Sequence, residues 1–225
     1  MPKYLNELKK LFSISANPEQ RDGMKAYMLN QFDFYGIKTP ERDKIVKAYI
    51  KANPLKTIEE VNGIVRKMWA FKEREWQYAA IDVFKYYHPL WEEHVIDVIE
   101  SCLTTKGWWD TVDGIGSDWI PVYFSYYPNQ IIPITERWNQ SDNIWLQRSS
   151  ILFQRSFKDK TNSRLLKKYI LKHKDSGNFF IQKAIGWSLR EYGKTNRDWV
   201  IDFVAKNKIA PLSKREAMKR IISKS

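Results

Sequence analysis

The sequence lacks several features that define common classes of protein. It holds one cysteine, Cys102, in 225 residues, so an internal disulfide is impossible, and no Cys-x-x-Cys or His/Cys spacing typical of structural zinc occurs. Glycine and proline number nine each, which is few for a chain that turns as often as a β-sandwich or barrel. These shortages argue against a secreted disulfide scaffold and a structural zinc site, and they favour a mostly helical protein.

Long apolar runs are also missing. The first twelve residues mix charged side chains with apolar ones, unlike the continuous apolar core of a signal peptide. The longest uncharged stretch, residues 119–135, is interrupted by three prolines and is too short and too broken to span a bilayer. We therefore expect a cytoplasmic protein with no membrane contact.

Charge is distributed very unevenly along the chain. Residues 1–140 carry 18 Lys and Arg against 19 Asp and Glu, a net charge of −1, whereas residues 141–225 carry 20 against 7, a net charge of +13. A basic excess this concentrated attracts phosphate through long-range electrostatics and counterion release. It indicates a nucleic-acid partner, with an anionic membrane or protein surface and a merely solvated basic face as the alternatives.

Helix-starting patterns recur through the sequence. Residues 17–19 (Asn-Pro-Glu) and 39–41 (Thr-Pro-Glu) each combine a capping side chain, a proline suited to the first helical position and an acid at the positive end of the helix dipole. Residues 57–60 and 213–216 have the spacing of a capping box. No convincing alternating strand is present, so we expect an all-α protein.

A repeat of 33 to 37 residues underlies these helices. Residues 146–151 match 181–186 at an offset of 35, and residues 76–81 and 109–113 have the same pattern. This interval is the length of one helical hairpin, which buries its apolar stripe only by stacking on its neighbours. The repeat predicts a single domain over residues 1–225, a right-handed α-solenoid of about six helical pairs with a concave face. Because the chain is strongly basic, we expect this face to be basic.

One repeat position carries an unusual residue. Asp113 stands where the other repeats have Ala80, Ser150 and Ile185, and Trp109 precedes it by one helical turn. Because burying an unpaired carboxylate is costly, we expect Asp113 to face the groove. The alternative from the residues alone is a tryptophan in the core and an acid paired with a basic neighbour.

Four segments in order, residues 108–113, 141–148, 179–187 and 210–217, resemble the AlkD family of DNA alkylation-repair glycosylases, and the similarity extends from about Leu8 to Ile221. The resemblance implies HEAT-like repeats and excision of cationic N3- and N7-alkylated purines, 3-methyladenine and 7-methylguanine among them, from duplex DNA, without a metal or organic cofactor. It further implies that Asp113 is the catalytic carboxylate, that Trp109 and Trp187 form the cleft around the deoxyribose, and that Arg148 holds the DNA backbone.

The same resemblance places an N-terminal DNA-packing helix at residues 17–30, including Tyr27. Asp43 departs from it, since the family tends to have a second basic residue there. Further candidates for phosphate contacts come from the basic C-terminal part: Lys183, Arg190, Lys194, Lys214 and Arg215. Phe179 and Phe180 are either repeat core or contacts to the minor groove.

The expected function is therefore that of a monomeric DNA glycosylase of base excision repair. Two other readings compete with it. One is a non-catalytic HEAT-like repeat protein that binds damaged or branched DNA, and the other is a protein-interaction scaffold. The carboxylate at Asp113 argues against the first alternative, because a protein that only binds polyanionic DNA has no use for it. The charge of +13 in residues 141–225 argues against the second.

Overall fold

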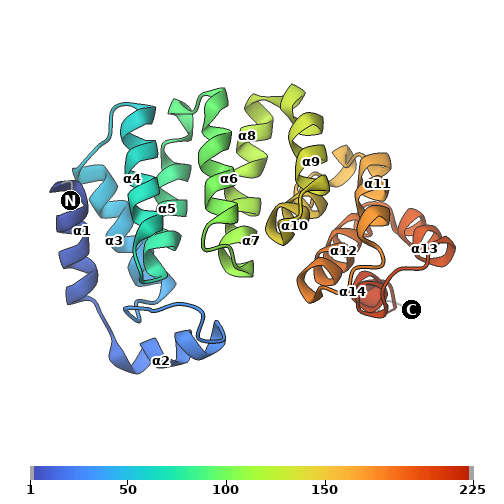
Figure 1. The fold of residues 1–225 in the computed structure, drawn as a ribbon, viewed down its shortest axis with the longest axis horizontal. Coiled ribbons are helices and arrows are strands. Elements are labelled where there is room, and N and C mark those ends of the chain that lie inside the picture. Colours follow the sequence, from blue (N-terminus) through green and yellow to red (C-terminus); the bar gives the residue numbers. More distant parts are fainter. Residues whose placement is uncertain (1–2, 223–225) are drawn as a thin grey trace. The chain divides into compact units, whose positions relative to one another are not determined.

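The computed structural model describes residues 3–222, which form helices joined by short connections (Figure 1). Among these residues the only β-pairing is an isolated bridge between Asp33 and Glu73. None of the described helices combines the length and the apolar character that crossing a membrane requires. The chain divides into two compact units, Met1–Cys102 and Leu103–Ser225. The all-α class expected from the repeat and the HEAT-like fold implied by the resemblance are confirmed, whereas the single domain and the basic concave face stay predictions.

The first unit contains a row of packed helices and one helix set apart from it. Helix α3 packs on α1 and α5, and α4 packs on α5. Helix α2 has no buried residue and lies beside the others (Figure 1). The bounds are α1 Lys3–Ile14, α2 Pro18–Tyr27, α3 Thr39–Ala52, α4 Ile58–Ala70, α5 Glu75–Tyr86, η1 His88–Leu90, η2 Glu93–Val95 and α6 Ile96–Thr104, whose last residues belong to the second unit.

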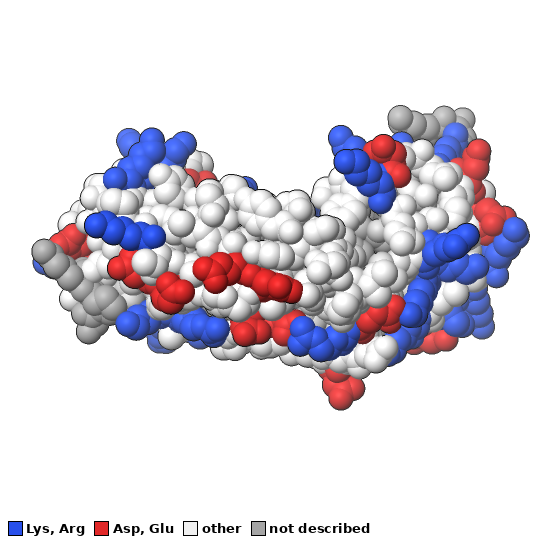
Figure 2. All heavy atoms as spheres, turned by 90° about the horizontal axis from the view of Figure 1, so that it is seen from above, with Lys and Arg blue, Asp and Glu red and all other residues white. Residues whose placement is uncertain are grey.

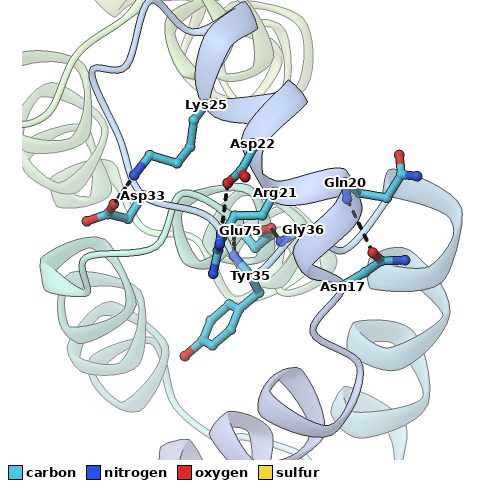
Figure 3. Close-up of polar contacts among 9 residues, drawn as sticks. All are labelled: Asn17, Gln20, Arg21, Asp22, Lys25, Asp33, Tyr35, Gly36 and Glu75. Atoms are coloured by element: carbon cyan, nitrogen blue, oxygen red, sulfur yellow. Dashed lines mark hydrogen bonds and ion pairs between the residues drawn. The ribbon is translucent and has the colours of Figure 1, made fainter.

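A buried carboxylate fixes the loop that follows α2. Glu75 is fully buried, and its two oxygens accept the backbone N–H groups of Tyr35 (3.1 Å) and Gly36 (2.8 Å) (Figure 3). The backbone N–H group of Ile37 also donates to this carboxylate, at 3.1 Å. Burial raises the pKa of Glu75, and these N–H groups oppose that rise. Gly36 has φ +91°, and a Cβ there would lie 2.0 Å from the carbonyl oxygen of Asn17, so only glycine fits.

The second unit continues as helices stacked in two layers. Helices α7, α10, α12 and α14 pack on one another in that order. Helices α9, α11 and α13 flank this row, with α9 and α11 on α10 and with α13 on both α12 and α14. The bounds are α7 Trp109–Asp118, α8 Ile120–Tyr126, η3 Pro128–Gln130, α9 Ile131–Gln140, α10 Ile144–Leu152, η4 Lys158–Lys160, α11 Ser163–His173, α12 Phe179–Tyr192, α13 Arg197–Lys206 and α14 Pro211–Ile222.

The sequence repeat is also a repeat of hydrogen bonds. Asn143 caps α10 and Asn178 caps α12, each accepting the backbone N–H groups two and three residues later at 2.9 and 3.3 Å. Gln77, Gln147 and Gln182 each donate to the carbonyl oxygen six residues earlier, at 3.0, 2.7 and 2.9 Å. Helices α10 and α12 therefore begin from matching turns, so side chains at matching positions leave these two helices at matching places, whereas α5 shares the glutamine contact without a side-chain cap.

Two helix starts differ from the expected caps. Asn17 and Thr57 cap α2 and α4 as predicted. Thr39, however, is the first residue of α3 and no side chain caps that helix. Ser213 lies inside α14, and its hydroxyl donates to the carbonyl oxygen of Gln182 on α12. The capping box expected at residues 213–216 is therefore wrong, because this hydroxyl serves the packing of two helices.

A close contact holds α12 against α14. The two helices meet at Gly186, where a Cβ would lie 2.5 Å from the Cβ of Glu216 and 2.9 Å from the carbonyl oxygen of Ser213. Around this contact the unit has an aliphatic core that includes Ile181, Ile185, Leu189 and other residues from α10, α11 and α13. This core sets the spacing between α10, α12 and α14, and α10 and α12 carry polar side chains of the candidate site.

Candidate active site

Asp113 lies in the middle of α7, one turn after Trp109. Its side chain is 19% exposed, so it is neither sealed in the core nor fully solvated. Both carboxylate oxygens accept hydrogen bonds from the same guanidinium, that of Arg148 on α10: Nε donates to Oδ1 at 2.9 Å and Nη2 donates to Oδ2 at 2.8 Å. This paired, fork-like geometry fixes the plane of the carboxylate. Because each oxygen keeps a free lone pair, the carboxylate can still accept a hydrogen bond from water.

Arg148 is almost completely buried, with its side chain 4% exposed. Its third nitrogen, Nη1, donates to the backbone carbonyl of Phe180 at 2.7 Å. The guanidinium therefore connects three helices of the same layer, α7, α10 and α12. The structure places this side chain on Asp113, and the backbone contact with DNA expected for it stays a prediction.

A second arginine links Asp113 to Trp187. The Ser117 hydroxyl donates to the backbone carbonyl of Asp113 at 2.8 Å and accepts Nη2 of Arg155 at 2.6 Å. The guanidinium carbon of Arg155 lies 4.0 Å from the centre of the Trp187 ring, which is a cation–π contact. Trp187 is thus linked to the surroundings of Asp113 through Arg155, a residue that sequence reasoning did not identify, and its role in a cleft around the deoxyribose stays a prediction.

The two phenylalanines that open α12 have different environments. Phe180 packs against Trp108 and Trp145, with ring centres 5.1 and 5.0 Å apart, and this aromatic cluster supports the carbonyl that receives Arg148. Phe179 is 58% exposed. Phe180 is thus a partly buried member of an aromatic cluster, whereas contact with DNA stays a prediction for the exposed Phe179.

The predicted phosphate-binding cations lie on the last helices of the second unit. Lys183 and Arg190 both pair with Glu216, at 2.9 and 2.6 Å, and these two cations lower the pKa of Glu216. Lys194 pairs with Glu191. The other two candidates, Lys214 and Arg215, are exposed in the first turns of α14. On the face shown in Figure 2, basic side chains gather over the C-terminal helices with acidic ones among them.

Two predicted positions belong to the first unit. Tyr27 ends α2 and is 68% exposed, so it is available to a partner of that helix. Asp43 accepts a hydrogen bond from the neighbouring Arg42 at 2.9 Å. The departure at position 43 thus gives a local ion pair in place of a second basic residue.

Sequence reasoning missed Arg155, Ser117 and Glu216. Ser117 lies four residues after Asp113, which is the helical spacing for contact, so this signal was available. Arg155 follows the end of α10, and no sequence spacing connects it to Trp187. Glu216 was expected as the end of a capping box, and that expectation concealed its role as the acid that pairs with two cations.

The assembled site has one carboxylate and two guanidinium groups: Arg148 bonds the Asp113 carboxylate directly, and Arg155 is linked to the backbone carbonyl of Asp113 through the Ser117 hydroxyl. Its acid is oriented and partly open to solvent, which suits stabilisation of a nearby cation or orientation of water. With two arginines beside one aspartate, the local charge of these three groups is positive. A polyanionic ligand is therefore electrostatically favoured here.

Comparison with known proteins identifies the family of this chain. A family model described as DNA alkylation repair enzyme matches residues 8–221. Among solved structures, a predicted DNA alkylation repair enzyme from Enterococcus faecalis is similar, with 34% sequence identity and a TM-score of 0.85 over 91% of this chain and 96% of that one. No curated protein matches. On the strength of the family match over almost its whole length, this chain belongs to the DNA alkylation repair enzyme family.

Proposed function

We propose that this protein is a monofunctional DNA glycosylase that hydrolyses the N-glycosidic bond of cationic N3- and N7-alkylpurines in duplex DNA. The observation that carries the proposal is the Asp113 carboxylate, which Arg148 orients from a buried position and which remains partly open to solvent one turn from Trp109. Membership of a DNA alkylation repair family supports the same substrate class. We also propose that the protein acts as a monomer.

The chemistry required of the protein is limited, because the substrate is already activated. Alkylation at N3 or N7 makes the purine a cation and hence a good leaving group, so no residue has to protonate it. As the bond to C1′ breaks, positive charge develops on the deoxyribose, and a carboxylate beside it stabilises the transition state more than the ground state. At a separation of about 4 Å and an effective dielectric constant of about 20, this attraction amounts to roughly 4 kcal/mol, or about a thousandfold in rate.

Asp113 has a second task in this reaction. A carboxylate oxygen that is held by a guanidinium and still reaches solvent can accept a hydrogen bond from the attacking water and orient it toward C1′. Trp109 and Trp187 would line the cleft, where the negative face of an indole attracts the same developing cation. Such a site recognises charge on the sugar and the lesion. We therefore expect no release of uncharged lesions such as uracil or 8-oxoguanine.

Affinity for DNA would come mainly from phosphate contacts. The candidates are Arg148, Lys183, Arg190, Lys194, Lys214 and Arg215, with Tyr27 contacting the DNA from α2. If about six phosphates are neutralised, binding should weaken by roughly three decades between 50 and 200 mM salt. A flat salt profile would remove the argument for a DNA-binding face.

The decisive experiment measures release of 7-methylguanine and 3-methyladenine from methylated duplex DNA. Asp113→Asn should lower the single-turnover rate by about a hundredfold to a thousandfold. Asp118→Asn makes the same change at the end of the same helix and should leave the rate close to that of the native protein. Equal activity in the native protein and in Asp113→Asn would refute the role of Asp113. No activity in the native protein, together with tight DNA binding, would identify a non-catalytic DNA-binding repeat protein.

A further inference from the structure

A cavity of about 450 Å³ lies in the second unit beside the candidate active site. Residues from the end of α10, from the connection to α11 and from α12 line it, and three of them are cations: Arg155, Lys158 and Lys194. The lining also includes five residues with hydroxyl groups, Ser156, Thr161, Ser188, Tyr192 and Thr195, and one acid, Glu191, which pairs with Lys194. Cations and hydroxyls together form the donor set that binds phosphate oxygens.

Arg155 belongs to both this cavity and the candidate active site. Its guanidinium rests on Trp187 at 4.0 Å and donates to the Ser117 hydroxyl. A guanidinium in this position occupies a face of the indole that would otherwise be open to a cationic sugar. The face cannot hold both groups at once, so the side chain must leave if this face of Trp187 is to receive substrate.

The environment of Arg155 favours such a departure. In the described part of the chain, the ion pairs formed by the neighbouring cations are Arg148 with Asp113 and Lys194 with Glu191, and no ion pair includes Arg155. Burial lowers the pKa of Arg155, and the nearby carboxylates of Asp113 and Glu191 offset this effect only in part. A partly buried guanidinium held by one hydroxyl and one ring is poorly neutralised. A phosphate would supply the bidentate anionic partner that it lacks.

Lys158 adds a backbone argument. It stands at the start of η4 with φ +53°, in the left-handed region that a lysine rarely adopts. Residues held in such conformations are concentrated at functional sites. The backbone of Lys158 is thus held in an unusual conformation at a point where its charged side chain belongs to the cavity wall.

From these observations we propose that Arg155, Lys158 and Lys194 form a phosphodiester-binding site. We also propose that the Arg155 guanidinium acts as a cover: it shields one face of Trp187 until it moves to bind a DNA phosphate. In the DNA-free protein the guanidinium lies on the indole, as in the structure. When duplex DNA binds, the guanidinium moves to a backbone phosphate at the cavity and exposes the indole. The cover function rests on the proposed role of Trp187, whereas the phosphate site does not depend on catalysis.

The same movement would resolve the charge excess at the active site. Two guanidiniums beside Asp113 leave a net positive charge, which opposes a developing cation. A phosphate that neutralises Arg155 leaves the carboxylate of Asp113 balanced by Arg148 alone. DNA binding would therefore prepare the site for its cationic transition state.

The first test is the salt dependence of binding to undamaged duplex DNA, which requires no base release. Arg155→Leu should lower the slope of log K against log salt by about 0.9, the value for one phosphate contact. Arg155→Lys should keep the slope, and Arg164→Leu, which removes an exposed arginine on α11, serves as the control. A native slope in Arg155→Leu, or an equal loss in the control, would overturn the phosphate site.

The second test follows the cover itself by NMR. The side-chain Nε–H signal of Arg155, assigned through its loss in Arg155→Lys, should lie upfield in the free protein because the indole ring current shields it. Undamaged duplex DNA should move it to the ordinary position of an arginine. A signal that stays upfield in the complex would overturn the cover. Both results can be obtained even if the protein releases no base, so failure of this inference and failure of the glycosylase proposal are distinguishable.

Discussion

The pair formed by Asp113 and Arg148 should respond asymmetrically to mutation. Arg148 is 4% exposed and Asp113 is 19% exposed, so water can reach the acid more easily than the base. Asp113→Asn keeps the shape of the side chain but removes the counterion, and its NH₂ group faces a guanidinium N–H. The result is a buried cation that retains its bond to the carbonyl of Phe180 but has no negative partner.

The size of the effect follows from these contacts. Breaking a buried ion pair from one side costs about 3–5 kcal/mol. Because the acid is partly exposed and some hydrogen bonds survive, we expect Asp113→Asn to lower the free energy of unfolding by about 2–3 kcal/mol. Arg148→Met removes the buried charge and leaves a carboxylate that water can solvate. We therefore expect this variant to lower the free energy of unfolding by only about 1 kcal/mol.

Urea unfolding followed by circular dichroism, with the m-value checked for each variant, measures both changes. The double variant Asp113→Asn/Arg148→Met should be more stable than Asp113→Asn alone, because no buried charge remains without a partner. If Asp113→Asn lies within about 0.5 kcal/mol of the native protein, or if Arg148→Met is the more damaging change, the reasoning about which partner is buried is refuted.

Two further predictions concern the contact between α12 and α14. Glu216→Gln removes the anion that pairs with Lys183 and Arg190, so DNA affinity and its salt slope should both increase. Since these cations lower the pKa of Glu216, its contribution to stability is present above the unfolded pKa of 4.5 and is lost as the pH falls through the lower folded value. Gly186→Ala places a methyl group 2.9 Å from the carbonyl oxygen of Ser213 and should lower the free energy of unfolding by about 1–3 kcal/mol.

Matched control variants separate the effects of these two contacts from the effects of overall charge and of adding a methyl group to any helix. Glu136→Gln removes the acid that pairs with Lys168, between α9 and α11, and should leave the salt slope nearly unchanged in fluorescence-anisotropy titrations. An equal rise in both variants would mean that overall charge, and not release of Lys183 and Arg190, governs affinity. For Gly186→Ala, a change in urea midpoint no larger than that of Gly63→Ala, where an added Cβ meets nothing, would contradict the close approach.

Local sequence patterns predicted the elements that depend on local interactions. Asn17 and Thr57 cap their helices as predicted, because each side chain accepts the backbone N–H group three residues later. The spacing of 33 to 37 residues predicted stacked hairpins, because each hairpin has the same apolar stripe to bury. The prediction failed at Ser213, whose hydroxyl bonds to Gln182 on another helix. A tertiary contact of this kind leaves no mark on the surrounding residues.

The same distinction explains which parts of the candidate site could be foreseen. Trp109, Asp113 and Ser117 follow one another at helical spacing on α7, so their proximity can be read from the chain. The bidentate pairing of Asp113 with Arg148 requires α7 and α10 to pack at one register, and the family resemblance identified both residues without their contact. Neither helical spacing nor the family resemblance identified Arg155, since this residue reaches Trp187 from a turn outside any helix. The phosphate site proposed at that turn is therefore the part of the function that depends most on three-dimensional structure, and the salt slope of Arg155→Leu tests it directly.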